Sequence, residues 1–405
     1  MDLSTADLWT LLAAALVLLM TPALGLFYGG MTRSTGVINM MLMSFSAAAL
    51  SAVVWVLWGY SLVAGQPAIA GFIGNPLSEF ALENTDPADL LAAGFAGTFA
   101  MIAVAIISGA IADRTRFSAW LIFVPVWVSL VYAPVAFWVW GGGLLSADGA
   151  IGSIFGEAID YAGGAVVHTN AGIAALVLAL KLGQRHNFHD RPQPHNTPLV
   201  MLGAALLWFG WFGFNAGAAT TVEEAGLIWV NTLAAPATAV LGWVVIERVR
   251  GSRPTSTGVA SGLVAGLVAI TPACANVSPG MALVLGFVAG AASSWAVNLK
   301  WKLGYDDSLD VVGVHVVAGL IGTVALGFIA LPSEESAGGL FYGGGFQLLI
   351  SQLVMCAVVI IFSAVATWVI ATVINKIVPW RISAEQEQAG IDSHEHDEEG
   401  YQLQR

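Results

Sequence analysis

Apolar residues run along the chain in long stretches separated by short polar segments. Eleven stretches approach or exceed about 20 residues, the length that crosses the hydrocarbon core of a bilayer as a helix. They cover residues 8–27, 40–64, 91–112, 117–140, 163–182, 198–217, 226–246, 257–272, 281–299, 311–330 and 346–375. Their Leu, Val and Ala composition lacks the period-two alternation of barrel strands. Because backbone groups in lipid must be hydrogen-bonded within the segment, the pattern predicts an all-α integral membrane protein with eleven transmembrane helices.

Composition supports this fold class and excludes others. Hydrophobic residues make up 57% of the chain and charged residues 10%, against about 25% charged in soluble domains. The net charge of -12 argues against nucleic acid as a partner. The two cysteines, Cys274 and Cys356, both lie in apolar segments, so we expect no disulfide framework. The first residues lack the basic region of a signal peptide, which predicts that the first apolar stretch is retained.

The basic residues predict an orientation, because Lys and Arg hold loops in the cytoplasm. The loops 65–90, 141–162, 218–225, 273–280 and 331–345 contain no Lys or Arg. All basic residues fall in the alternate loops and the tail: Arg33, Arg114, Arg116, Lys181, Arg185, Arg191, Arg248, Arg250, Arg253, Lys300, Lys302, Lys376, Arg381 and Arg405. An odd number of helices with the N-terminus outside and the C-terminus inside accounts for this sorting.

Two halves of the chain share a short pattern. The fifth stretch contains His168 followed by Gly172, and the tenth contains His315 followed by Gly319. Since five is odd, the two halves would be a five-plus-five inverted repeat, an arrangement that places a substrate path at the interface between repeats near the midplane. Chance similarity in Gly-, Ala- and Val-rich sequence is the alternative. The remaining stretch, 346–375, is long enough to predict a tilted last helix.

His168 and His315 are candidate functional residues, because ionisable side chains inside a bilayer are rare. Two neutral imidazoles can share a proton or accept one from a weak acid. The alternative is a structural role in which each ring bonds a carbonyl between helices. Straight helices that enter from opposite faces would leave the rings roughly 10 Å apart in depth. Contact therefore requires helices that begin deep, for example at 163–164, and two ligands are too few for a metal site.

Asp160 stands just before the fifth stretch. An N-cap accounts for a carboxylate at this place. Direct binding of a cation is the alternative, and we favour structural support over it.

Several aromatic residues are expected at one depth near the outer face. Phe95 and Phe99 begin the third stretch, Trp140 ends the fourth, and Trp211 and Phe214 lie near the outer end of the sixth. Aromatic faces attract small cations by about 0.5–2 kcal/mol per contact. The alternative is an interfacial aromatic belt, which accounts poorly for Phe99 and Phe214 because both are deep and apolar.

Three motifs together resemble the ammonium transporter (Amt/Mep/Rh) family, specifically its prokaryotic Amt branch, along nearly the whole chain. They are residues 160–168 (DYAGGAVVH), 211–217 (WFGFNAG) and 310–315 (DVVGVH). The resemblance implies an outer cation-recruitment site, a phenyl gate and a hydrophobic pore with twin histidines. Residue by residue it implies recruitment by Trp140 and Phe99 with Phe95 nearby and Asp160 in support, a gate of Phe99 and Phe214, and a pore lined by Trp211, His168 and His315.

The chain departs from this family at one position. The family's recruitment site often includes a serine hydroxyl where this chain has Ala218. One hydrogen bond is worth about 0.5–1.5 kcal/mol, so the departure predicts weaker recruitment rather than loss of transport.

The resemblance also implies a homotrimer and a cytoplasmic regulatory tail that engages a PII signalling protein. It divides the chain into a transmembrane domain, 1–379, and the tail, 380–405. The alternative for the tail is a solvated acidic segment.

The expected function is selective ammonium/ammonia transport across the cytoplasmic membrane, with deprotonation at the outer site and no cofactor. The runner-up is an ammonium sensor that signals through the tail with little flux. A membrane enzyme lacks support, because no nucleophile motif or metal-ligand cluster accompanies the histidines. A gas or water channel is a closer alternative, and the presence of the outer aromatic site would distinguish an ammonium transporter from it.

Overall fold

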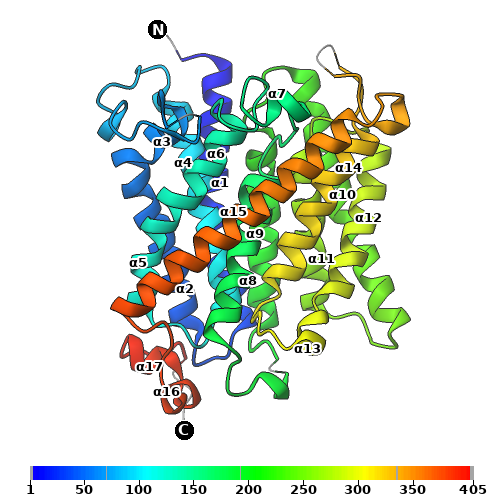
Figure 1. Cartoon of the computed structure of the whole chain (residues 1–405). Helices are drawn as coiled ribbons and strands as arrows, with labels where there is room; N and C mark the ends of the chain where they lie inside the picture. The colour runs from blue at the N-terminus through cyan, green and yellow to red at the C-terminus, as the bar shows by residue number, and fades with distance from the viewer. Residues whose placement is uncertain (1–2, 70, 192, 334–335, 402–405) are drawn as a thin grey trace.

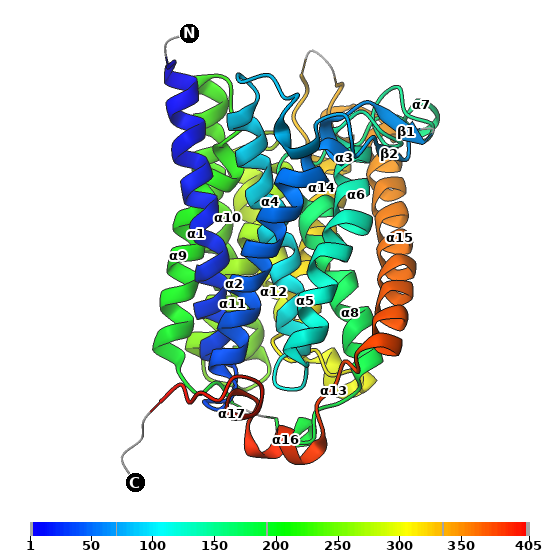
Figure 2. The same cartoon turned by 90° about the vertical axis from the view of Figure 1, so that its left-hand side faces the viewer.

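The computed structural model describes residues 3–69, 71–191, 193–333 and 336–401. These residues contain eleven helical spans long and apolar enough to cross a membrane, and each coincides with one predicted stretch. The prediction of an all-α protein with eleven such helices is therefore confirmed. Figures 1 and 2 show an upright bundle whose N-terminus lies at one end and whose C-terminal tail lies at the other. We call these ends the N-terminal face and the tail face.

The first five spans are built from helices that are often interrupted by a tighter or wider turn. In order they are α1 (Thr5–Met31); α2 (Val37–Val54), η1 (Trp55–Gly59) and α3 (Tyr60–Ala64); α4 (Leu90–Ser108) and η3 (Gly109–Ile111); α5 (Phe117–Trp127), η4 (Val128–Tyr132) and α6 (Ala133–Trp140); and η5 (Gly164–Thr169) with α8 (Asn170–Leu182). Of these turns η1, η4 and η5 are π-helical, a conformation frequent at functional sites.

The remaining spans follow the same plan. They are α9 (Thr197–Ala216); α10 (Val222–Val249); α11 (Ser256–Ile270) with η7 (Thr271–Ala273); α12 (Pro279–Ala296) with α13 (Leu299–Leu303); the π-helical η8 (Val312–Val316) with α14 (Val317–Ile329); and α15 (Gln347–Ile377). Short elements in the connections are β1 (Pro67–Ile69) paired with β2 (Ile73–Gly74), η2 (Phe80–Leu82), α7 (Gly152–Phe155), η6 (Phe188–Asp190) and η9 (Leu340–Tyr342).

Helix α15 crosses the bundle obliquely, as Figure 1 shows. Its 31 residues span roughly 46 Å at 1.5 Å per residue, which exceeds the hydrocarbon thickness of about 30 Å. A helix of this length must tilt. The predicted long tilted last helix is therefore confirmed.

The two segments that carry the histidines cross at the centre, and two glycines allow the close approach. A Cβ at Gly172 would lie 2.5 Å from Cγ2 of Val316, and a Cβ at Gly319 would lie 3.0 Å from the carbonyl oxygen of Gly164. Each glycine stands four residues after one histidine and packs against the turn that carries the other. The shared His-x-x-x-Gly pattern is thus a reciprocal packing contact between the halves of the chain.

The tail folds back on the bundle through two short helices, α16 (Ala384–Ala389) and α17 (Ile391–Glu395), below the tail face (Figure 2). The Asp392 carboxylate accepts hydrogen bonds from the backbone N–H groups of Ile38 (3.0 Å) and Asn39 (2.8 Å), at the start of α2. Glu395 accepts one from Phe117 N–H (2.9 Å), at the start of α5. The part of the tail that the structure describes, up to residue 401, is therefore docked by carboxylates at helix N-termini.

Candidate functional site

An aromatic cavity of about 240 Å³ lies on the N-terminal side of the bundle. Its lining contains five of the residues predicted for the site, Phe95, Phe99, Trp140, Phe214 and Ala218. The other lining residues are Trp55, Val63, Ala96, Tyr132, Ala136, Tyr161 and Ala162. Trp55 and Tyr132 were missed from the sequence, because nothing in their local pattern separates them from aromatic residues that pack in the core. Tyr161 belongs to the motif 160–168 but was given no role at the site.

Phe99 and Phe214 are stacked at the buried side of this cavity. Their ring centroids lie 4.2 Å apart with an interplanar angle of 21°. The two side chains are 6% and 1% exposed, so the pair is almost sealed from solvent. The ring of Trp140 stands nearly perpendicular to Phe99, at 87° and 6.2 Å between centroids. The cavity is therefore walled by ring faces and edges, a surface that suits a small cation or an apolar molecule.

Asp160 lies beside the cavity but does not line it. Its carboxylate accepts four backbone hydrogen bonds of 2.6–3.0 Å at the start of η5, from Gly163, Gly164, Ala165 and Val166. Its own carbonyl oxygen accepts a hydrogen bond from Nε1 of Trp140 (2.8 Å). The same residue thus fixes the first turn of the histidine segment and the indole that walls the cavity.

The two predicted histidines meet below the phenylalanine pair. Nδ1 of His168 lies 3.2 Å from Nδ1 of His315, and the rings are stacked with centroids 5.3 Å apart. The side chains are 1% and 4% exposed. Trp211 also stacks on His168, with ring centroids 5.4 Å apart, and the Phe214 ring centroid lies 6.0 Å from that of His168. Straight helices would leave the two rings roughly 10 Å apart in depth. The rings meet instead because their helical segments begin deep in the bundle, η5 at Gly164 and η8 at Val312.

The contact between the imidazoles restricts their protonation. When both rings are neutral, one Nδ1 must donate a proton and the other must accept it. The two rings are then opposite tautomers, so one Nε2 is an acceptor and the other is a donor. Nε2 of His168 is buried and has no hydrogen-bond partner among the described residues. A buried polar atom without a partner is costly, which marks it as a place where a polar ligand would bind.

Asp307 is a supporting residue that the sequence interpretation missed. Its carboxylate accepts hydrogen bonds from N–H of Val311 (3.0 Å) and Val312 (2.7 Å), at the start of η8. Burial raises its pKa to about 6, although the nearby Lys300 ammonium acts in the opposite direction. The available signal was spacing, because Asp307 precedes His315 by eight residues and Asp160 precedes His168 by eight residues.

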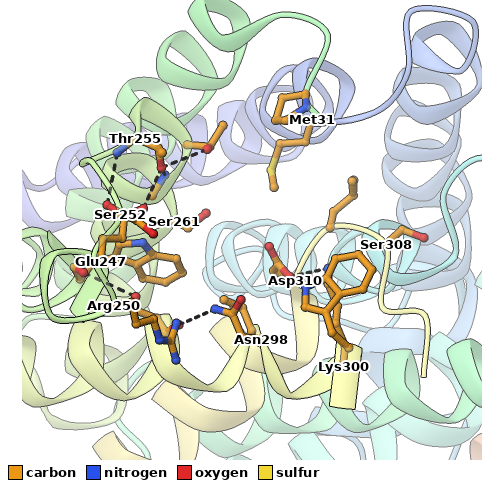
Figure 3. A pocket seen from close by; sticks show the side chains of 18 residues that line it. Met31, Glu247, Arg250, Ser252, Thr255, Ser261, Asn298, Lys300, Ser308 and Asp310 are labelled. Carbon is orange, nitrogen blue, oxygen red and sulfur yellow. Dashed lines mark hydrogen bonds and ion pairs between the residues drawn. The ribbon is translucent and has the colours of Figure 1, made fainter. Parts of the chain in front are cut away.

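A second, polar cavity of about 310 Å³ lies on the tail side, between α10, α11, α12 and the segment that leads to η8. Figure 3 shows its side chains, with Lys300 beside Asp310 and Glu247 beside Thr255. Lys300 Nζ donates to Asp310 Oδ1 (2.6 Å) and to the carbonyl of Asp307 (2.7 Å). This tail-side cavity was not predicted, because segments that are distant in the sequence form it.

Eleven apolar spans around buried histidines that lie below an aromatic cavity define a multi-pass membrane protein with an internal polar site. The sequence matches the family described as the Ammonium Transporter Family over residues 8–401. The chain therefore belongs to the ammonium transporter family, whose named activity is transport of ammonium rather than enzymatic catalysis.

Individual relatives cover almost the whole chain. A protein named ammonium transporter from Mycobacterium tuberculosis strain H37Rv is 47% identical over 426 residues, which covers 97% of this chain and 89% of that protein. The ammonium transporter of Bacillus subtilis strain 168 is 43% identical over 399 residues and covers 96% of each.

Solved structures agree with the sequence comparisons. The crystal structure of Saccharomyces cerevisiae Mep2 has a TM-score of 0.84 at 32% identity and covers 95% of this chain and 90% of that one. A structure described as Sensor Amt Protein has a TM-score of 0.86 at 28% identity and covers 96% and 98%.

Proposed function

We propose that this transporter recruits ammonium in the aromatic cavity, where water accepts its proton, and that ammonia then passes between Phe99 and Phe214 to the histidine pair while the proton is relayed to the tail side. The observation that carries the proposal is the paired His168 and His315 buried directly below stacked phenyl rings. An apolar constriction next to a polar but uncharged pair favours a neutral molecule over an ion.

Recruitment rests on the ring faces of the aromatic cavity. Trp140, Phe99 and Phe95 supply the ring quadrupoles, and the lining, as far as the structure describes the chain, contains no charged side chain that would hold the cation tightly. Asp160 contributes by position, since its carboxylate is engaged by four backbone N–H groups. With Ala218 in the lining, no hydroxyl is available at that position to accept a hydrogen bond from ammonium.

Deprotonation follows from the cost of burying a charge. An ion without a counter-charge in a low-dielectric passage is disfavoured by many kcal/mol, whereas neutral ammonia needs only hydrogen bonds. The His168 Nε2 atom offers such a hydrogen bond. The Nδ1 contact gives a route by which a proton is exchanged between the rings, and Trp211 holds the ring of His168 in place by stacking.

We further propose that the tail face is cytoplasmic and the membrane is the cytoplasmic membrane. The basic residues of the alternate loops support this orientation. The tail lies on the same face as these basic residues. Arg33 donates a hydrogen bond to the carbonyl of Glu387 in the tail (2.6 Å), and Arg381 pairs with the Glu387 carboxylate (2.7 Å). The aromatic cavity would then open toward the outside, and the tail-side cavity would receive ammonia on the cytoplasmic side.

Purified protein in liposomes tests the transport mechanism. Solid-supported-membrane currents would be recorded on pulses of ammonium, potassium and buffer, and internal pH would be followed in the same liposomes. We expect the double variant His168→Leu/His315→Leu to lose ammonium transport while the exposed His189→Leu control keeps it. Undiminished, equally selective uptake by the double variant would refute a role of the histidine pair.

Sensing remains the second candidate, and the docked tail is the observation that favours it. Asp392 and Glu395 tie the tail to α2 and α5, so displacement of the tail would be transmitted to those helices. We propose residues 380–405 as a regulatory tail that a PII-type protein engages, on homotrimeric transporters. Deletion of the residues after Pro379 separates the two candidates. If the protein is a sensor, the deletion should change ammonium signalling and leave the ammonium flux unchanged. If the protein is a regulated transporter, the deletion should change the ammonium flux. Native mass spectrometry would give the subunit number.

A further inference from the structure

A small cavity of about 160 Å³ lies where α8 and α15 end at the tail face, away from the histidine pair. Lys181, Leu182, Asn375, Trp380 and Arg381 line it. Figure 2 shows the ends of these two helices close to each other above α16. We call it the Lys181–Arg381 cavity.

The charge of this cavity is opposite to that of the whole chain. The whole chain has a net charge of -12, yet the described residues that line the cavity include two cationic side chains and no carboxylate. Among the residues that the structure describes, the acidic group paired with them is Glu387 of the tail, whose carboxylate accepts a hydrogen bond from NH2 of Arg381 (2.7 Å). The lining is therefore suited to an anion.

Both cations are held in place yet keep unused donors. Lys181 Nζ donates to Oγ1 of Thr372 (2.6 Å) and lies 4.5 Å from the ring centroid of Trp368. An ammonium group has two further protons to donate. Arg381 donates through NH1 to the carbonyl of Leu182 (3.0 Å) and through NH2 to Glu387, and none of these bonds uses its Nε. Fixed cations with spare donors lose little conformational entropy when they bind a phosphate.

The surroundings indicate a lipid rather than a dissolved ion. Leu180, Trp368 and Ile377 are 61%, 55% and 67% exposed, and all three belong to membrane-spanning helices. Exposed apolar side chains on such helices face acyl chains, and tryptophan favours the headgroup level. Lys181 lies in the last turn of α8, the place where lysines keep their ammonium group in the polar zone.

We propose that the Lys181–Arg381 cavity binds the phosphate of an anionic phospholipid in the leaflet at the tail face. The acyl chains lie along the exposed surface of α8 and α15, and the phosphate bridges Lys181 and Arg381. The site adjoins the tail, because Glu387 shares Arg381 with the phosphate. Lipid binding and tail docking therefore use one guanidinium group.

Native mass spectrometry of the purified full-length protein tests this site. The probes are phosphatidylglycerol, phosphatidylcholine and inorganic phosphate, titrated separately and in competition. Lys181→Gln should weaken phosphatidylglycerol binding roughly fivefold or more and leave phosphatidylcholine binding unchanged, because a charge-assisted hydrogen bond is lost. Lys376→Gln removes the same charge from an exposed position on α15 outside the cavity, and it should change the affinity less than twofold.

A second pair of variants guards against misfolding. Asn375→Asp keeps the acceptor for Trp380 N–H at an exposed position and adds a negative charge to the lining, so it should also weaken phosphatidylglycerol binding. Lys181→Arg keeps a positive charge at this position and should therefore bind phosphatidylglycerol as the wild type does. Equal losses in Lys181→Gln and Lys376→Gln, or equal binding of the two lipids, would overturn the proposal. Displacement of phosphatidylglycerol by inorganic phosphate at equal concentration would identify a free-anion site and overturn the lipid assignment.

Discussion

Asp160 and Asp307 occupy matching places in the two halves of the chain. Each stands eight residues before a buried histidine. Each carboxylate accepts backbone hydrogen bonds at the start of the π-helical turn that contains this histidine. One holds η5 from the N-terminal side, and the other holds η8 from the tail side. The position of the histidine pair thus depends on two carboxylates that do not contact it.

Replacement of Asp160 tests whether this residue supports the structure around η5 or binds the cation directly. Asp160→Ala leaves four backbone N–H groups without their acceptor, and since each unpaired buried donor costs about 1–3 kcal/mol, we expect unfolding free energy to fall by at least about 3 kcal/mol. Asp160→Asn keeps one oxygen acceptor and should lose less. The melting temperature in detergent should decrease from wild type to Asn to Ala, with the exposed Asp148→Ala as control. An Ala variant with wild-type stability and no transport would instead indicate direct cation binding.

Enlarging Gly172 should separate the two imidazoles. The Cβ of Gly172→Ala would meet Cγ2 of Val316 at 2.5 Å and the backbone nitrogen of Val316 at 3.1 Å, next to His315. Overpacking of this kind costs about 1–3 kcal/mol and moves backbone. We expect a large loss of ammonium current with a modest fall in melting temperature. Gly226→Ala is the matched control, since a Cβ there meets nothing within 4 Å, and it should keep full current.

The fold could be predicted because its main determinant is local. Length and apolar composition define each span without knowledge of its neighbours, and all eleven predicted stretches coincide with spans in the structure. The grouping of several aromatic residues in one cavity could be predicted for a related reason. Phe99, Trp140 and Phe214 lie near helix ends on one side of the bundle, so topology alone places them at similar depth.

Other features depend on contacts that the sequence pattern does not encode. The π-helical turns at His168 and His315 and the deep starts of their helices bring the rings together, whereas straight helices predicted a separation of roughly 10 Å. Asp307 was missed because a carboxylate in a polar loop gives no sign that it is buried. The tail-side cavity was missed because it forms between segments such as Glu247 and Asp310 that are far apart in sequence.

Adding a hydroxyl to the aromatic cavity should strengthen recruitment. Ala218 lines the cavity with Trp140 and Phe99, so a serine there would offer ammonium one acceptor. A hydrogen bond of about 0.5–1.5 kcal/mol corresponds to a roughly two- to tenfold lower half-saturating ammonium concentration for Ala218→Ser. Current recorded against ammonium concentration measures this change. Ala219→Ser, whose position does not line the cavity, should leave the concentration unchanged. An unaltered value for Ala218→Ser would mean that the cation does not contact this wall.

The raised pKa of Asp307 predicts how stability depends on pH. Burial raises this pKa from the ordinary 3.8 to about 6, so folding favours the protonated carboxyl. The contribution of Asp307 to the free energy of unfolding is therefore fully present below about pH 3.8 and is lost as pH rises through about 6. The loss amounts to about 3 kcal/mol by linkage.

Asparagine cannot ionise, so Asp307→Asn should lack this part of the pH dependence. The quantity to follow is the difference in melting temperature, wild type minus Asp307→Asn. We expect this difference to decrease as the pH is raised from 4 to 7. Taking the difference removes the contributions of other groups, among them Asp392, whose pKa burial also raises, and Asp306, whose bonds to Arg185 outweigh burial and lower its pKa. The exposed Asp148→Asn should follow the wild type at every pH. A difference that rises with pH would mean that the hydrogen bonds from Val311 and Val312 to Asp307 favour the carboxylate strongly enough to outweigh its burial, so that η8 is held by a charged cap.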